Sequence, residues 1–115
     1  MPTAWTPLDR AEALAYLTLG VLGAVWPWSY NLAYMEVHEQ FDVAAFVAEA
    51  VSTPAGGSLT VDLGIGGTAW LIWMVRDARQ HGLRWWPWVG VMFLVAFACA
   101  CPLFLLRRKL WLMSR

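Results

Sequence analysis

The stretch TVDLGIGGTAWLIWMV, Thr60–Val75, decides the class of fold. It is apolar apart from its two threonines and Asp62, which lies near its start. Together with Leu59 it comes close to the ~20 residues that an α-helix needs to cross the hydrocarbon core of a bilayer. The stretch therefore predicts a membrane-spanning helix, and it raises the question of what neutralises the carboxylate of Asp62.

The composition supports a membrane protein. The chain has 115 residues, of which 60% are hydrophobic and 14% are charged, whereas soluble domains average roughly 45–50% and about 25%. A soluble chain of this length has too little interior to bury so much apolar surface, so the excess is expected to face lipid or other proteins. Eight basic and eight acidic residues cancel, which leaves no basic surface of the kind that binds nucleic acid.

The hydropathy pattern predicts one all-α domain over residues 1–115 with three transmembrane helices. They cover about residues 13–35, 59–75 and 86–106. Between the first two spans, the apolar residues of EVHEQFDVAAFVAEAVSTPAGGS recur at helical spacing. This predicts a short amphipathic helix over about residues 39–51, lying at the membrane interface.

Tryptophans gather near the ends of the predicted spans, as in the aromatic belt of membrane proteins. These are Trp5, Trp26, Trp28, Trp85, Trp86, Trp88 and Trp111. Trp70 and Trp73 instead lie within the second span and share one face of it. They are compatible with a platform for a pigment or quinone, but contact between helices is the favoured interpretation.

Each predicted span contains small residues at the spacing that lets two helix backbones approach closely. The candidate packing positions are Gly20 and Ala24 in the first span, Gly64 and Thr68 in the second, and Ala96 and Ala100 in the third. A compact three-helix bundle is the expected result.

Asp62 is expected to have a cationic partner, because an ionised aspartate inside a membrane costs about 2.5–3.5 kcal/mol at the centre and less near the interface. If all three spans cross, the third ends on the side where the second begins. We therefore predict a structural ion pair between Asp62 and Arg107 or Arg108, with a polar cluster of Tyr30 and Asn31 around it. The alternative is that Asp62 is a proton or cation site, although spans one and three offer no further titratable group at depth.

The basic residues favour a cytoplasmic N-terminus. The second loop, RDARQHGLR, carries Arg76, Arg79 and Arg84, whereas the first loop has no lysine or arginine. With three crossings, however, the basic tail RRKLWLMSR would lie on the opposite side.

The second half of the chain resembles a known family. An acid in the second span, the loop RDARQHGLRWW and an ending PLFLLRR are similar to the bacterial integral-membrane family of domain of unknown function 2834. The matching residues are Asp62, Arg79, Gly82, Arg84, Pro102, Leu103, Phe104 and Arg108. Leu106, Lys109 and Cys99 depart from the pattern. The resemblance implies about three helices in a bacterial inner membrane and no agreed activity.

Motifs for catalysis or metal binding were not found in the sequence. Cys99 and Cys101 would point about 200° apart on a helix and cannot share a metal, and we expect no metal site and no intrinsic cofactor. Contact with lipid, quinone, carotenoid or a chlorophyll-type pigment is compatible with the tryptophans.

Two functions are compatible with these features. The favoured one is a non-catalytic accessory subunit of a larger bacterial membrane complex, photosynthetic or respiratory, which helps assembly or the packing of lipid and pigment. Its partners would be the bilayer and other subunits, in a hetero-oligomer rather than a homo-oligomer. The alternative is a small oligomeric transporter or lipid-processing enzyme that uses Asp62.

Overall fold

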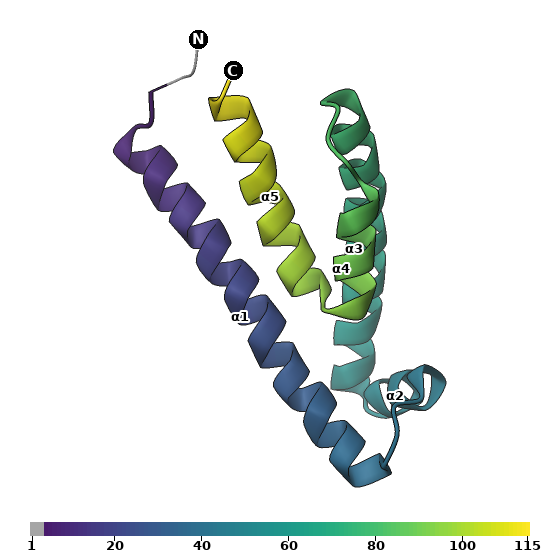
Figure 1. Ribbon diagram of the computed structural model, residues 1–115. Helices are drawn as coiled ribbons and strands as arrows, with labels where there is room; N and C mark the ends of the chain where they lie inside the picture. The colour runs from purple at the N-terminus through teal and green to yellow at the C-terminus, as the bar shows by residue number, and fades with distance from the viewer. Residues whose placement is uncertain (1–3) are drawn as a thin grey trace.

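The computed structural model describes residues 4–115, and this part of the chain is all-helical with no strand. Five helices follow one another: α1 (Pro7–His38), α2 (Val43–Ala50), α3 (Pro54–Gln80), α4 (Trp86–Leu94) and α5 (Phe97–Met113). The short predicted helix of the first loop corresponds to α2, which begins after the N-cap Asp42. Figure 1 shows that α1 and α3 are long rods joined through α2, and that the start of α1 and the end of α5 lie at the same end of the molecule.

The boundaries of α1 and α3 follow from local chemistry. Both helices start with a proline, whose missing N–H is no loss at that position. Thr6 caps α1 in a capping box with Asp9, and the hydroxyl of Thr53 caps α3. At the far end of α3, Gly82 adopts φ +69°, and the N–H of Leu83 donates to the carbonyl of Ala78 at 2.8 Å. This is a Schellman ending, in which glycine accommodates the left-handed backbone.

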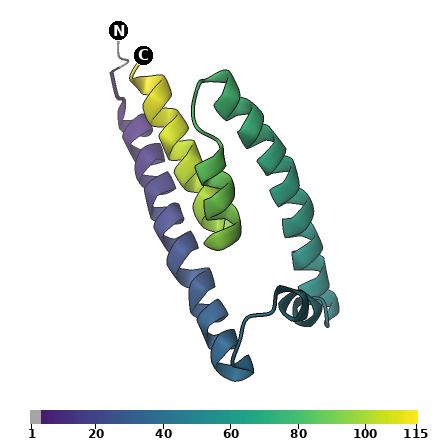
Figure 2. The same ribbon diagram turned by 45° about the vertical axis from the view of Figure 1, so that its right-hand side comes forward.

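The predicted third span does not form one crossing. The run 86–106 is divided into α4 and α5 at Val95 and Ala96, where Ala96 is extended with φ −175° and ψ 151°. The chain turns back there, so α4 and α5 form a hairpin that returns to the end from which it came (Figures 1 and 2). The indole N–H of Trp28 in α1 donates to the carbonyl of Val95 at 2.7 Å, which satisfies a backbone group that the break has released.

Small residues allow α1 and α5 to pack closely in antiparallel directions. A Cβ on Gly20 would collide with the side chain of Leu103, and one on Gly23 would collide with the backbone carbonyl of Ala98. Ala24, the predicted partner of Gly20, is only half-buried, since Gly23 faces α5 instead. Ala100 is fully buried in α5, whereas Ala96 caps that helix at the break.

The predicted packing pair of α3 is shifted by one turn. A Cβ on Gly64 would meet nothing within 4 Å, and the hydroxyl of Thr68 donates to the carbonyl of Gly64 in its own helix. Gly67 is the buried position, and a Cβ there would approach the methyl group of Met92 in α4. Gly64, Gly67 and Thr68 therefore lie on the same side of α3 and line one groove with Met92 and Phe93 of α4, but only Gly67 is buried.

The core lies in the half of the molecule near the chain ends. Phe104 and Met74 are its largest fully buried side chains. Three tryptophans pack edge-on to the ring of Phe104 at centroid distances of 5.8–6.0 Å: Trp70, Trp73 and Trp88. Trp70 and Trp73 thus contact α5, the arrangement that the favoured interpretation of this pair expects, and Trp73 remains 41% exposed.

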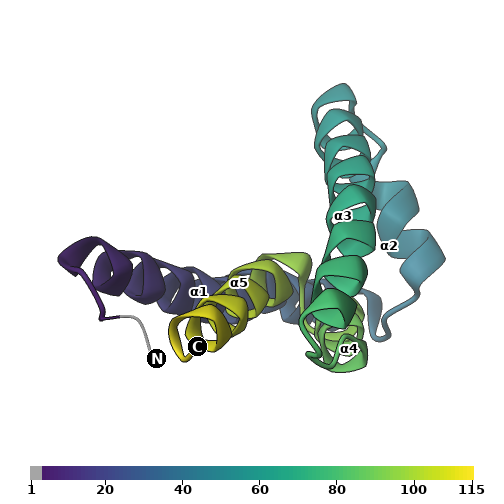
Figure 3. The same ribbon diagram turned by 90° about the horizontal axis from the view of Figure 1, so that it is seen from above.

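Among the described residues, one helix, Pro54–Gln80, is long and apolar enough to cross a membrane. The hairpin offers no second one, because α4 has 9 residues and α5 has 17. In α1 the apolar run is interrupted by proline, tryptophan and tyrosine, which lower its hydropathy. Three transmembrane helices are therefore not confirmed. Figure 3 shows α1 and α5 on one side of the molecule and α3 with α2 on the other.

Candidate functional site

Charge divides the molecule into two ends. The hairpin returns the C-terminal residues to the N-terminal end, so that end, the cationic end, carries all eight basic residues of the chain: Arg10, Arg76, Arg79, Arg84, Arg107, Arg108, Lys109 and Arg115. With Asp9, Glu12 and Asp77 it has a formal net charge of +5. The remaining five acids lie toward the other end, the acidic end, which has a formal net charge of −5: Glu36, Glu39, Asp42, Glu49 and Asp62.

A buried ion pair joins α3 to α5 at the cationic end. The Nε of Arg108 donates to the carboxylate of Asp77 at 2.8 Å, and only 6% of Asp77 is exposed. The Nδ1 atom of His81 lies 3.4 Å from the other carboxylate oxygen, and the His81 ring packs edge-on against Trp111. The guanidinium of Arg108 also lies over the ring of Trp73, 5.6 Å from its centroid. This cluster fixes the end of α3 against α5.

A second ion cluster joins α1 to α5. The ammonium group of Lys109 donates to Asp9 at 3.0 Å and to Glu12 at 2.8 Å. Hydrogen bonds from the backbone N–H of Thr6 and from Lys109 lower the pKa of Asp9 to about 2. The hydrogen bonds that Lys109 donates to Glu12 and Asp9 in turn raise the pKa of Lys109. Lys109 thus joins the first turns of α1 to α5.

The predicted ion pair of Asp62 is not formed. Arg108 binds Asp77, and Arg107 is exposed on the same cationic end. Asp62 is about 22 Å away from Asp77 along α3, at about 1.5 Å per residue, so the tail cannot reach it. The prediction was wrong because it assumed that the third span crosses; the hairpin at Val95–Ala96 reverses the direction of α5.

The predicted polar cluster around Asp62 is also absent. Tyr30 is 68% exposed and lies along an apolar groove between α1 and α5, beside Trp26 and Phe97. Asn31 is half-buried in α1. Within residues 4–115, the carboxylate of Asp62 takes part in no ion pair.

Asp62 lies instead on a helical face that no other element of the described chain covers. Its neighbours one turn away, Leu59 and Ile65, are 71% and 68% exposed, and a Cβ on Gly66 would meet nothing within 4 Å. We call this surface the open face of α3: Leu59, Asp62, Ile65, Gly66 and Ala69, all exposed or partly so at helical spacing. It combines one unpaired charge with apolar side chains.

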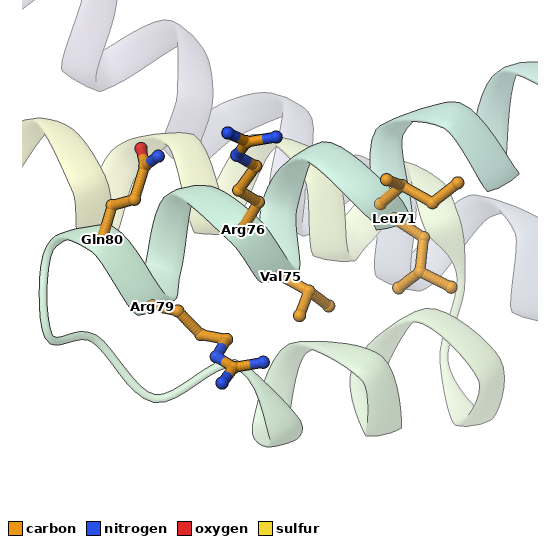
Figure 4. A pocket seen from close by; sticks show the side chains of 6 residues that line it. Leu71, Val75, Arg76, Arg79 and Gln80 are labelled. Carbon is orange, nitrogen blue, oxygen red and sulfur yellow. The ribbon is translucent and has the colours of Figure 1, made fainter.

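A groove follows the other half of α3, toward the cationic end. Six residues line it: Leu71, Ile72, Val75, Arg76, Arg79 and Gln80 (Figure 4). Both arginines are exposed, and neither forms an ion pair with an acid in the described chain. The groove is apolar at one end and cationic at the other.

Sequence reasoning missed Asp77, the only buried charged residue among those described. It occurs in RDARQHGLR, where neighbouring arginines suggest a solvated loop, yet α3 continues to Gln80. One signal was available: Asp77 and His81 are four residues apart, the spacing of neighbours on a helix surface. Gly82 is a typical signal just beyond a helix C-terminus, and it would have predicted that α3 continues through Asp77 to a cap at His81.

A family model matches most of the chain. The model of a family described as a protein of unknown function, DUF2834, matches residues 15–110. The chain belongs to this family. No curated protein and no solved structure matches it. Of the residues that carry the resemblance, Gly82 ends α3, Phe104 fills the core and Arg108 binds Asp77.

Several surfaces of the described chain are open to a binding partner. Within residues 4–115, no three histidine, cysteine or acidic side chains gather as metal ligands. His81 is held between Asp77 and Trp111, and Cys99 is buried in α5. The open face of α3, the groove beside Arg76 and Arg79 and the apolar groove between α1 and α5 are surfaces that the described part of the chain leaves uncovered.

Proposed function

We propose that this DUF2834 protein is a non-catalytic accessory subunit of a larger complex in the bacterial inner membrane. The observation that carries the proposal is the open face of α3, where Asp62 is exposed and forms no ion pair within residues 4–115. Of the helices in that range, α3 is the one that is apolar and long enough to span a membrane. An acid in this setting needs a partner. A transmembrane helix of another subunit, carrying a lysine or arginine near that depth, would supply it.

The large exposed apolar area supports a membrane location. On α1, Leu14, Val25 and Trp26 are each more than 60% exposed, and Leu59 and Ile65 are comparable on α3. Such surfaces are unusual on a soluble monomer and are normal against lipid or another subunit. In this proposal α1 and α3 cross the membrane, and the α4–α5 hairpin enters and leaves from one side. Non-helical backbone is tolerated at membrane depth where protein covers it, and Trp28 covers the break at Val95.

The charge distribution supports one orientation. All eight lysines and arginines lie at the cationic end, and none at the acidic end. Because positive residues are retained on the cytoplasmic side, we propose that the start of α1 and the end of α5 face the cytoplasm, with α2 on the opposite side of the membrane. Three crossings would leave the basic tail on the outer side, against the preference of positive residues for the cytoplasm. With the hairpin, the tail returns to the side of the other basic residues.

Asp62 determines which kind of helix can pack against the open face of α3. Two copies of the open face would bring two carboxylates together, which disfavours a symmetric homodimer through this surface. A helix with a basic side chain would form a charge-assisted pair there. The exposed Gly66 would allow its backbone to approach closely. Whether the complex is photosynthetic or respiratory follows from the identity of that partner.

The test is purification of the tagged protein in mild detergent, with mass spectrometry of what accompanies it. We expect one partner in fixed stoichiometry with the native protein. Asp62→Asn should lose that partner and still insert and unfold like the native protein. Glu36→Gln, which neutralises another exposed acid at the same end, should retain it. Isolation of the native protein as a lone monomer contradicts the proposal, as does equal loss in both variants.

A second candidate is a small oligomeric transporter or lipid-processing enzyme that uses Asp62. The observation in its favour is the same unpaired carboxylate, because an acid without a cationic partner is free to bind a proton or cation. The experiment separates the two functions. In a transporter, Asp62→Asn abolishes transport while leaving the oligomer intact; in an accessory subunit it releases the partner.

A further inference from the structure

We infer that the groove on α3 binds the phosphate headgroup of an anionic phospholipid from the leaflet at the cationic end. The lining residues form two neighbouring rows along the helix, because residues four apart lie above one another. One row is Leu71, Val75 and Arg79, and the other is Ile72, Arg76 and Gln80. Each row therefore runs from an apolar side chain to a polar one, in the same direction.

The geometry fits an amphipathic ligand. The groove has a volume of about 680 Å³. In Figure 4 the guanidinium of Arg76 and the amide of Gln80 project to one side of α3, and Arg79 reaches toward the start of α4. From Leu71 to Arg79 the helix rises about 12 Å, which is enough to place the arginines at headgroup level while the leucine and isoleucine contact acyl chain.

The charges of the groove are available for an external anion. Of the basic residues that the fold gathers at this end, Arg108 and Lys109 are bound to Asp77, Asp9 and Glu12. Arg76 and Arg79 flank Asp77 in sequence, but the carboxylate of Asp77 is buried on the opposite side of the helix and accepts from Arg108. Two guanidinium groups therefore face outward without a counter-ion from the chain, and arginine pairs well with phosphate oxygens.

A lipid is favoured over a free anion by the apolar half of the groove. Leu71, Ile72 and Val75 offer nothing to inorganic phosphate, but they continue the same groove. Basic pockets beside transmembrane helices on the cytoplasmic side bind acidic headgroups. This step rests on the proposed membrane location and orientation, but it does not depend on Asp62 or on any partner subunit.

The test is native mass spectrometry of the full chain released from nanodiscs that contain equal amounts of phosphatidylglycerol and phosphatidylcholine. The native protein should retain phosphatidylglycerol preferentially. Arg76→Gln with Arg79→Gln should lower that retention about tenfold or more, since each basic residue near an anionic surface contributes measurably. Arg10→Gln, an exposed cation of the same end that lies outside the groove, should change it less than twofold.

Three results would overturn the inference. The native protein could retain both lipids equally, a measurement that needs no folded variant. Arg10→Gln could reduce retention as much as the groove variants, which would indicate bulk charge alone. Inorganic phosphate at millimolar concentration could displace the lipid, which would indicate a site for the free anion. Each leaves the accessory-subunit proposal standing, because that proposal is tested by co-purification with Asp62→Asn.

Discussion

The cationic and acidic ends of this DUF2834 protein differ in how far the chain satisfies its own side chains. At the cationic end, Asp77, Asp9 and Glu12 all have cationic partners, and the buried ring of Phe104 lies nearby. Toward the acidic end, Asp62 and Ile65 are exposed on α3. One end is therefore stabilised from within, while the other presents surface that a partner or lipid must cover.

The α4–α5 hairpin causes this difference. It packs between α1 and α3 in the cationic half only, since it turns back at Val95 and Ala96. Below the turn, α1 and α3 are linked through α2: His38 lies 3.3 Å from Glu49, and Tyr34 packs against Phe46. The stabilising core and the surface proposed to bind a partner subunit are thus expected to reside in different halves of one molecule.

The largest expected effect is on the core. Phe104→Ala should destabilise the protein by about 3–5 kcal/mol, because it leaves a cavity between three tryptophans. Thermal or denaturant unfolding in detergent measures this. Phe41→Ala is the matched change at the acidic end, where the ring is 39% exposed, and should cost about 1 kcal/mol or less. If both variants lose the same free energy of unfolding, the two ends of the molecule are equally well packed.

A smaller effect is expected from the buried ion pair. Asp77→Asn should cost about 3 kcal/mol, the lower end of the range for breaking a buried pair, because 32% of the Arg108 side chain is exposed. Asp62→Asn should change the stability of the isolated protein by about 0.5 kcal/mol or less. The comparison fails if Asp62→Asn destabilises the isolated protein as much as Asp77→Asn does.

The smallest effect concerns acid pH. The folded pKa of Asp9, about 2, lies below the usual value of 3.8, so its ionised form is favoured by folding. The resulting stabilisation is complete above pH ~4 and is lost as the pH falls through 2. The difference in Tm between the native protein and Asp9→Asn should therefore shrink between pH 4 and pH 2. If the difference in Tm stays constant over this pH range, the ion pair between Asp9 and Lys109 does not stabilise the fold.

Local features of the fold could be predicted from sequence because they depend on neighbours in the chain. Thr53, Pro54 and Gly82 determine where α3 starts and ends through caps and a left-handed turn. The apolar run Leu59–Val75 lies within that helix. The candidate site could be predicted only in part: Asp62 was recognised as an unusual acid, but its predicted partners were wrong, and Asp77 was missed.

The error came from one place where the chain carries no local marker. Nothing in VMFLVAFAC resembles a helix breaker, so residues 86–106 were predicted to form one continuous span. The break is stabilised from outside that segment, by the indole of Trp28 and by the contact of Gly23 with the backbone at Ala98. Interactions of this kind join residues that are far apart in the chain, and periodicity does not report them.

The sequence by itself determined the all-helical class, the membrane-scale length of α3 and the supply of eight cations and eight acids, because these depend on composition and on residues within a few positions of each other. The tertiary structure decided which acids those cations meet. By folding the last helix back, it brings Arg108 to Asp77 and Lys109 to Asp9, and it leaves Asp62 exposed about 22 Å away along α3. The direction of a helix depends on what it packs against, and that information lies outside its own residues.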